Sequence, residues 1–286
     1  MNPDAAIASP VLLAVLGAAL LHASWNALLK RRGEPLLATL LVVAGATLLA
    51  AIALPLLPAP ASACWPFIAA SSGIHTVYFL LLIETYGDGQ VSHAYPLMRG
   101  CAPLLVALAD GPLTGEALSV GQWCAMLLIC GGVLGQWLAA RRGSHGARRA
   151  TVFALLTAGV IAAYTLVDGQ GVRRSGAPAA YTLWIFVLTG VVVCAWTVRG
   201  RLRALAGFAR ANPLVAPLGG IASVGSYVIA LWAMTRAPVA AVAALRETSI
   251  LFATAIAVVV LREPVGRARL AAIALIACGA IAMRLA

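Results

Sequence analysis

Residues 35–57 read PLLATLLVVAGATLLAAIALPLL, a run without a charged residue. A helix needs about 20 apolar residues to cross the hydrocarbon core of a bilayer, so this run predicts a membrane-spanning helix. Nine further apolar runs accompany it, separated by Gly, Pro and basic residues. They lie near residues 9–29, 65–86, 91–110, 119–140, 150–170, 178–198, 213–236, 239–261 and 267–285. The sequence therefore predicts an all-α integral membrane protein with ten transmembrane helices.

The composition agrees with this class. The chain of 286 residues is 62% hydrophobic and 10% charged, with a mean hydropathy of +0.97. Soluble domains have about 45–50% apolar and about 25% charged residues, so a soluble, disordered or disulfide-stapled secreted chain is excluded. Most of the net charge of +11 lies in short loops between apolar runs, which is typical of membrane proteins and does not indicate nucleic-acid binding. The six cysteines show no C-x-x-C spacing and are interpreted as small core residues.

Scarce polar residues recur at fixed spacing in the two halves of the chain. A shift of 147 residues superposes Arg99 on Arg246, Glu116 on Glu263 and Gly132 on Gly279. A shift of 142 residues superposes His22 on Tyr164 and Asn26 on Asp168. We predict two five-helix repeats, residues 1–145 and 146–286. An odd number of helices inverts the second copy in the membrane, which is the architecture of many secondary transporters.

Several segments resemble the drug/metabolite transporter superfamily, in its ten-helix branch built from two EamA-type repeats. They are His22–Lys30 (HASWNALLK), Leu113–Glu116 (LTGE) and Leu261–Pro264 (LREP). Residues 95–100 (YPLMRG) also resemble a subgroup associated with phosphonate utilisation. The resemblance implies transport of a small metabolite, often an amino acid or a nucleotide-linked compound.

Two arginines lie deep inside apolar runs, Arg99 and Arg246. Arginine at such depth is costly and normally faces a partner, a cavity or water. Both occupy matched positions of the repeat, so we expect them to clamp a carboxylate or a phosph(on)ate, whose geometry fits the planar guanidinium. The alternative is that their side chains extend to the membrane interface.

Polar and aromatic side chains share helix faces in both halves. Alone, such a residue more often hydrogen-bonds a neighbouring helix, but the set as a whole favours a cavity lining. The expected substrate-binding residues, besides the two arginines, are His22, Trp25, Asn26, His75, Tyr78, Tyr95, Tyr164 and Tyr227.

Two carboxylates are candidates for carrying a coupling proton, Glu247 and Asp168. Glu247 lies eight residues inside an otherwise apolar helix, and Asp168 lies on the polar face matched to His22 and Asn26. An ionised carboxylate at either place needs a partner. The alternative for Glu247 is an interhelical ion pair with Arg99.

Other features are interpreted as structural. Gly131-x-x-x-Gly135 predicts close helix packing, and Glu116 and Glu263 are expected at helix starts, where a carboxylate complements the helix dipole.

The leading hypothesis is a secondary transporter for a small anionic or zwitterionic metabolite that is amino-acid-like, an organic acid or phosphonate-like. It would work by alternating access, with a proton as the candidate coupling ion, and with the first, third and fourth helices of each half lining the site. The alternative is an integral membrane enzyme or sensing subunit acting on a lipid-linked substrate. No phosphate-binding Gly-rich loop, H-E-x-x-H motif or Ser–His–Asp set is found, so we expect no enzyme, no cofactor and no metal.

The expected partners are a small-molecule substrate and membrane lipid, with no nucleic acid, and the chain is expected as a monomer or homodimer in a bacterial inner membrane. With ten spans, loops on the side opposite the N-terminus hold 14 of the Lys and Arg residues and the other side holds four. The positive-inside rule then favours an external N-terminus, whereas the resemblance implies that both termini are inside.

Overall fold

The structure is a computed structural model that describes residues 7–30, 34–87, 91–140, 147–259, 262 and 266–286. Helices account for nearly all of the described residues, and no strand occurs in them. The helices are α1 (Ser9–Lys30), α2 (Pro35–Ala53), α3 (Trp65–Gly87), α4 (Val91–Thr114), α5 (Val120–Ala140), α6 (Ala147–Ser175), α7 (Pro178–Thr197), α8 (Leu202–Ala211), α9 (Val215–Met234), α10 (Val239–Arg246), α11 (Ser249–Val259) and α12 (Arg267–Leu285). Two short 3₁₀ turns, Leu54–Leu56 and Ser62–Cys64, connect α2 to α3.

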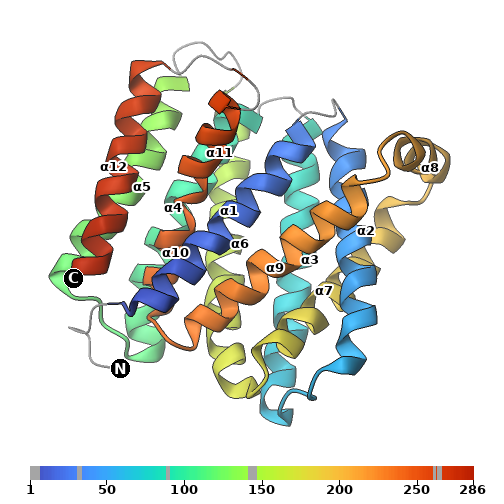
Figure 1. Cartoon of the computed structure of the whole chain (residues 1–286), viewed down its shortest axis with the longest axis horizontal. Helices are drawn as coiled ribbons and strands as arrows, with labels where there is room; N and C mark the ends of the chain where they lie inside the picture. Colours follow the sequence, from blue (N-terminus) through green and yellow to red (C-terminus); the bar gives the residue numbers. More distant parts are fainter. Residues whose placement is uncertain (1–6, 31–33, 88–90, 141–146, 260–261, 263–265) are drawn as a thin grey trace.

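The predicted class is confirmed, because the chain is an all-α membrane protein. Within the described ranges, nine segments are long and apolar enough to cross a membrane, and α10 and α11 together form one of them. α4 is also long enough to cross, but it is less apolar because it contains Arg99 and Asp110. It stands among the other long helices and packs against α5 and α6 (Figure 1).

One predicted span is interrupted. The run near 239–261 was expected to be a single helix, but α10 ends at Arg246 and α11 begins at Ser249. Around Glu247 and Thr248 the backbone N–H groups bond three residues back, to Ala244 and Leu245, instead of four. This 3₁₀-type bonding separates two helical halves without any Gly or Pro in the segment.

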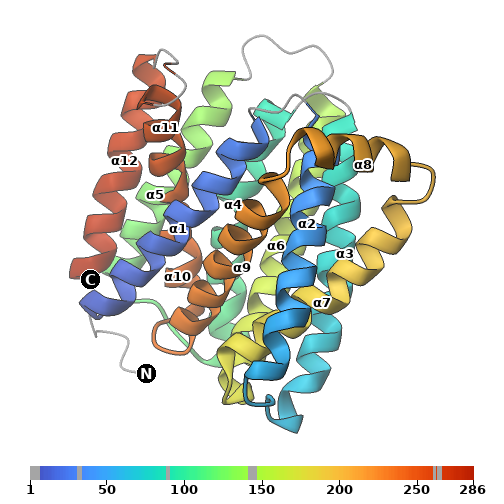
Figure 2. The same cartoon turned by 45° about the vertical axis from the view of Figure 1, so that its right-hand side comes forward.

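A short helix was not predicted at all. α8 lies across the bundle rather than along it, beside the start of α2 (Figure 2). Its Leu205 and Phe208 pack towards Ala38 and Leu41 of α2, while its arginines are exposed. Ten residues are too few to span a membrane, and the amphipathic pattern is that of a helix lying in the interface.

The bundle has two faces that differ in charge. The terminal face is where α1 begins and α12 ends, and Arg284 Nη2 donates to Ser9 Oγ there at 2.9 Å (Figure 1). The arginine face is the opposite one, where α1 ends and α2 begins. Its described arginines are Arg148, Arg149, Arg199, Arg201, Arg203, Arg210, Arg262, Arg267 and Arg269, whereas the terminal face has Arg173, Arg174, Arg236 and Arg284.

Helix pairs from the two halves of the chain correspond to each other. α1 packs against α9 as α6 packs against α3, and α4 packs against α6 as α10 and α11 pack against α1. The last helices of the two halves, α5 and α12, pack together at one end of the bundle (Figure 1). If the two predicted repeats are exchanged, the pair of α1 and α9 becomes that of α6 and α3, the pair of α4 and α6 becomes that of α1 with α10 and α11, and the pair of α5 and α12 is unchanged.

The close contact of α5 and α12 depends on two glycines that differ from the predicted pair. A Cβ on Gly132 would lie 2.8 Å from the Ala272 carbonyl oxygen, and one on Gly279 would lie 2.8 Å from the Ala125 carbonyl oxygen. Gly131 and Gly135 have open space instead, so the predicted G-x-x-x-G packing is wrong. The two glycines matched by the repeat are therefore the ones that let the helices approach.

The predicted role of Glu116 is also corrected. α5 begins at Val120, and its start is capped by Ser119 and Gln122, which exchange side-chain and backbone hydrogen bonds at 3.1 and 3.2 Å. Glu116 instead forms a bidentate ion pair with Arg173 at the end of α6, at 2.8 and 3.1 Å. Glu263 lies outside the described residues.

Candidate functional site

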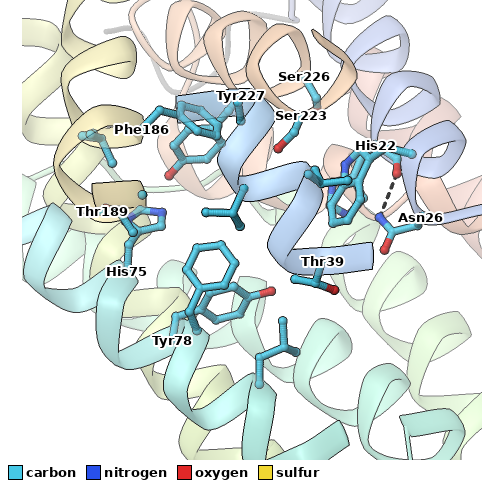
Figure 3. A pocket seen from close by; sticks show the side chains of 18 of the residues that line it. His22, Asn26, Thr39, His75, Tyr78, Phe186, Thr189, Ser223, Ser226 and Tyr227 are labelled. Carbon is cyan, nitrogen blue, oxygen red and sulfur yellow. Dashed lines mark hydrogen bonds between the residues drawn. The ribbon is translucent and has the colours of Figure 1, made fainter. Parts of the chain in front are cut away.

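Eight helices line a cavity of about 130 Å³. Side chains from α1, α2, α3, α7 and α9 point into one space (Figure 3). All ten residues predicted to bind substrate lie on its wall. They are His22, Trp25 and Asn26 from α1, His75 and Tyr78 from α3, Tyr95 and Arg99 from α4, Tyr164 from α6, Tyr227 from α9 and Arg246 from α10.

The cavity lies near the middle of the bundle. α1 contributes residues from its second half and α4 from its first half, and both of these halves lie towards the arginine face. The lining residues of α2, α3, α7 and α9 fall on both sides of the midpoints of their helices. No described residue of α5 or α12 lines the cavity.

Two contributing helices were missed in the sequence. α2 supplies Thr39 and Val42, and α7 supplies Phe186 and Thr189, although only the first, third and fourth helices of each half were expected. Most of the missed residues are apolar or hydroxyl-bearing and resemble any lipid-facing or core position. Thr39 carries a usable signal, because it is one of only two hydroxyl-bearing residues in the apolar run 35–57.

Arg99 forms a buried ion pair with Glu247. Its Nε donates to Oε2 at 3.0 Å, and its Nη2 lies 2.9 Å from Oε1, although the N–H bonds of Nη2 are not aligned for a hydrogen bond. Arg99 is 8% exposed and Glu247 3% exposed. The pair links α4 to the break between α10 and α11. This is the interhelical contact that sequence reasoning left as the alternative for Glu247.

Arg246 has a different environment from Arg99. Its guanidinium carbon lies 5.2 Å from the centre of the Tyr227 ring, a cation–π contact. In the part of the chain that the structure describes, no carboxylate forms a salt bridge with it. Arg246 is thus the cavity arginine whose charge is available to a ligand.

Asp168 lies just outside the cavity wall. Its carboxylate is fully buried and accepts hydrogen bonds from the hydroxyls of Tyr181, at 3.1 Å, and Tyr227, at 2.5 Å. No described Lys or Arg lies within ion-pair distance of it. Tyr227 therefore connects the buried carboxylate to the cavity.

An aromatic cluster forms one side of the cavity. The rings of His75 and Tyr164 stack at 4.0 Å with an interplanar angle of 25°, and Tyr78 meets Tyr164 edge-on at 5.9 Å. His75 Nδ1 lies 3.0 Å from the Ser71 carbonyl oxygen, which fixes the orientation of the ring. Such a wall offers apolar contact together with ring edges and faces for a ligand.

Two buried donors on the opposite side have no partner. The indole Nε1 of Trp25 and the hydroxyl of Thr39 make no hydrogen bond with any residue that the structure describes. On the same side, Asn26 Nδ2 donates to the His22 carbonyl oxygen at 2.8 Å (Figure 3). A buried donor without a partner costs free energy, so a ligand that accepts hydrogen bonds would satisfy both groups.

The fold is that of a helical membrane protein, and the cavity between its helices is a candidate site for a small molecule. Residues 149–285 match the EamA-like transporter family. The second half of the chain is therefore similar to the domain of this transporter family. The likeness to the phosphonate-associated subgroup stays a prediction.

A solved crystal structure has the same fold. It superposes with a TM-score of 0.70, shares 21% sequence identity, and the alignment covers 96% of each chain. Curated proteins give no match. The whole length of the chain thus adopts a known fold, of which the family match covers the second half.

Proposed function

We propose that the chain is a secondary transporter that moves a small metabolite bearing an anionic group across the membrane by alternating access. The observation that carries this proposal is Arg246, a cationic side chain on the cavity wall that has no carboxylate partner among the described residues. The partnerless donors of Trp25 and Thr39 support it, because they suit a ligand rich in acceptor oxygens.

Alternating access needs two conformations of similar free energy. The repeats proposed for residues 1–145 and 146–286 supply them, since exchanging the conformations of the two halves would move the opening from one face to the other. The corresponding helix pairs, such as α1 with α9 and α6 with α3, support this relation.

The arginine face is proposed to be cytoplasmic, because basic residues concentrate on the cytoplasmic side of membrane proteins. In a bacterial inner membrane, both ends of the chain would then lie on the side away from the cytoplasm.

We further propose that a coupling proton is carried by Asp168 and not by Glu247. The charge of Glu247 is compensated by its ion pair with Arg99, whereas Asp168 has only hydroxyl donors within hydrogen-bond distance among the described residues. The groups facing it are Tyr181 from α7, Tyr227 from α9, and Ser71 and His75 from α3. A buried carboxylate without a cationic partner is a natural site for reversible protonation.

The test of function is transport by the purified full chain in liposomes, with labelled monocarboxylates and amino acids as probes. Arg246→Ala should lower uptake of the best probe about thirtyfold or more, because removing one partner of a buried charged contact costs at least about 2 kcal/mol. Arg246→Lys should have an intermediate effect, because it keeps the charge but loses the fork.

Arg236→Ala is the matched control. Arg236 also lies over an aromatic ring, that of Trp232 at 5.6 Å, but it is exposed on the terminal face away from the cavity. Equal losses in the two variants, or wild-type uptake by Arg246→Ala, would contradict the proposed role of Arg246.

A further inference from the structure

We propose that Glu247 sets the charge of the ligand that the cavity accepts. By neutralising Arg99 it leaves Arg246 as the uncompensated cation, so that the transporter takes singly charged anions and rejects dianions. This inference rests on the proposed function, in which Arg246 binds the anionic group.

The geometry places the three charges at one site. Arg99 and Arg246 both line the cavity, and Glu247 follows Arg246 directly in the chain, at the break after α10. The Glu247 carboxylate nevertheless turns to α4, where both of its oxygens lie within 3.0 Å of the Arg99 guanidinium. Two guanidiniums and one carboxylate carry a net charge of +1.

The sequence makes the arrangement asymmetric. The repeat matches Arg99 to Arg246, but it matches Glu247 to Gly100. The position after Arg99 could hold no second carboxylate without rearrangement, because a Cβ there would lie 2.8 Å from Leu134 Cγ. One of two matched arginines is therefore neutralised and the other is not.

A second negative charge on the ligand would have no cation to meet. Among the described residues on the cavity wall, the other basic side chains are His22 and His75. His75 is stacked on Tyr164 and held by Ser71, and the ring of His22 meets Trp25 edge-on at 5.3 Å. A dianion would have to bury one charge unpaired or break the Arg99–Glu247 pair, and either is unfavourable.

A purely structural role for Glu247 makes a different prediction. If the pair only ties α4 to the break after α10, removing either partner lowers stability and weakens every ligand alike. A charge-setting role instead changes the preference between ligands of equal size. The readout is therefore the ratio of two dissociation constants, which a uniform loss of affinity leaves unchanged.

The experiment measures binding of butyrate and succinate, which have four carbons each and carry one and two carboxylates. The full chain is purified in detergent, and dissociation constants are taken from ligand-dependent thermal stabilisation. The wild type should prefer butyrate. Glu247→Gln, which frees the Arg99 charge, should shift the ratio towards succinate by about tenfold or more, the range seen for close buried charge pairs.

Two further variants keep the test decisive. Arg99→Gln with Glu247→Gln removes both charges, so the ratio should return towards that of the wild type whatever the loss in affinity. Arg99→Gln alone leaves a net charge of zero and should weaken butyrate binding more than that of uncharged butyramide. This variant tests the idea even if Glu247→Gln does not fold.

The outcomes separate the two proposals. A wild-type preference for succinate, or a ratio that does not change in Glu247→Gln while binding persists, overturns the charge-setting role and leaves Arg246 as the anion site. If neither acid binds the wild type and Arg246→Ala transports its best probe normally, the proposed function fails and this inference fails with it.

Discussion

Arg99 and Arg246 occupy matched positions in the two halves of the sequence, yet their surroundings differ. Arg99 is paired with Glu247, and Arg246 lies over Tyr227. Their depth in apolar runs could be recognised from the sequence, because charge is scarce there. The partner of Glu247 could not be decided, because it depends on how the chain turns after α10.

The buried carboxylate Asp168 gives a prediction about energy coupling. Asp168→Asn keeps the size of the side chain but cannot gain or lose the proton. For one proton per substrate, a difference of one pH unit sustains about a tenfold substrate gradient, since each is worth about 1.4 kcal/mol. The variant should lose this accumulation in liposomes and retain counterflow exchange.

Asp110→Asn serves as the control for this experiment. Asp110 is a buried carboxylate on α4, 2% exposed, and it does not line the cavity. Its variant should accumulate substrate as the wild type does. If Glu247→Gln lost accumulation while Asp168→Asn accumulated substrate normally, Glu247 and not Asp168 would be the residue that carries the coupling proton.

Among the helices, the long ones were predicted to within a few residues. A span of about 20 apolar residues is fixed by the thickness of the bilayer, so its signal survives whatever the helix packs against. α8 was missed because ten amphipathic residues with arginines look like a basic loop. The break between α10 and α11 was missed because no Gly or Pro marks it.

The pairing of α5 with α12 gives a prediction at the scale of these helices. Gly132→Ala places a methyl group 2.8 Å from the Ala272 carbonyl oxygen, so the helices must separate. Overpacking of this kind costs about 1–3 kcal/mol, and the unfolding temperature in detergent should fall.

Gly131→Ala is the neighbouring control. Nothing lies within 4 Å of a Cβ at Gly131. Alanine is the better helix former by up to about 1 kcal/mol, so this variant should unfold at the same temperature or higher. The opposite order of the two variants would show that Gly132 does not set the distance between the helices.

At the scale of the whole molecule, the terminal face is closed by contacts between several helices. Arg173, at the end of α6, pairs with Glu116 and also donates to the carbonyl oxygens of Met234, at 2.8 Å, and Ala237, at 3.1 Å. One guanidinium thus joins the end of α6 to the segments that follow α4 and α9. These contacts must break if the terminal face opens.

Cys64 provides a reporter of that opening. It is fully buried in the 3₁₀ turn that packs against α6, where Ala61 N donates to the Ser175 carbonyl oxygen at 2.9 Å. In a chain with Cys64 as its only cysteine, Arg173→Ala should raise the rate of labelling by a membrane-impermeant maleimide in intact cells, about fivefold for each kcal/mol lost from the closed state.

Arg174→Ala is the matched control for this measurement. Arg174 is exposed, bonds to Gln170 on its own helix and lies over the Phe67 ring, so its loss should leave the labelling rate unchanged. Labelling of Arg173→Ala that requires permeabilised cells would place the terminal face in the cytoplasm, against the orientation proposed here. No increase under either condition would show that Arg173 does not hold this face closed.

The described residues of α5 and α12, the last helix of each half, take no part in the cavity that eight other helices line. Substitutions that change the cavity lining and substitutions that change the outward surface of α5 and α12 therefore fall in different segments of the chain. The outward residues of α5 and α12, such as Leu127 and Leu275, are free to adapt to the surrounding bilayer or to a neighbouring copy. Substitutions on this surface would leave the cavity unchanged. A transporter with this architecture could therefore change its membrane or subunit contacts without changing its substrate specificity.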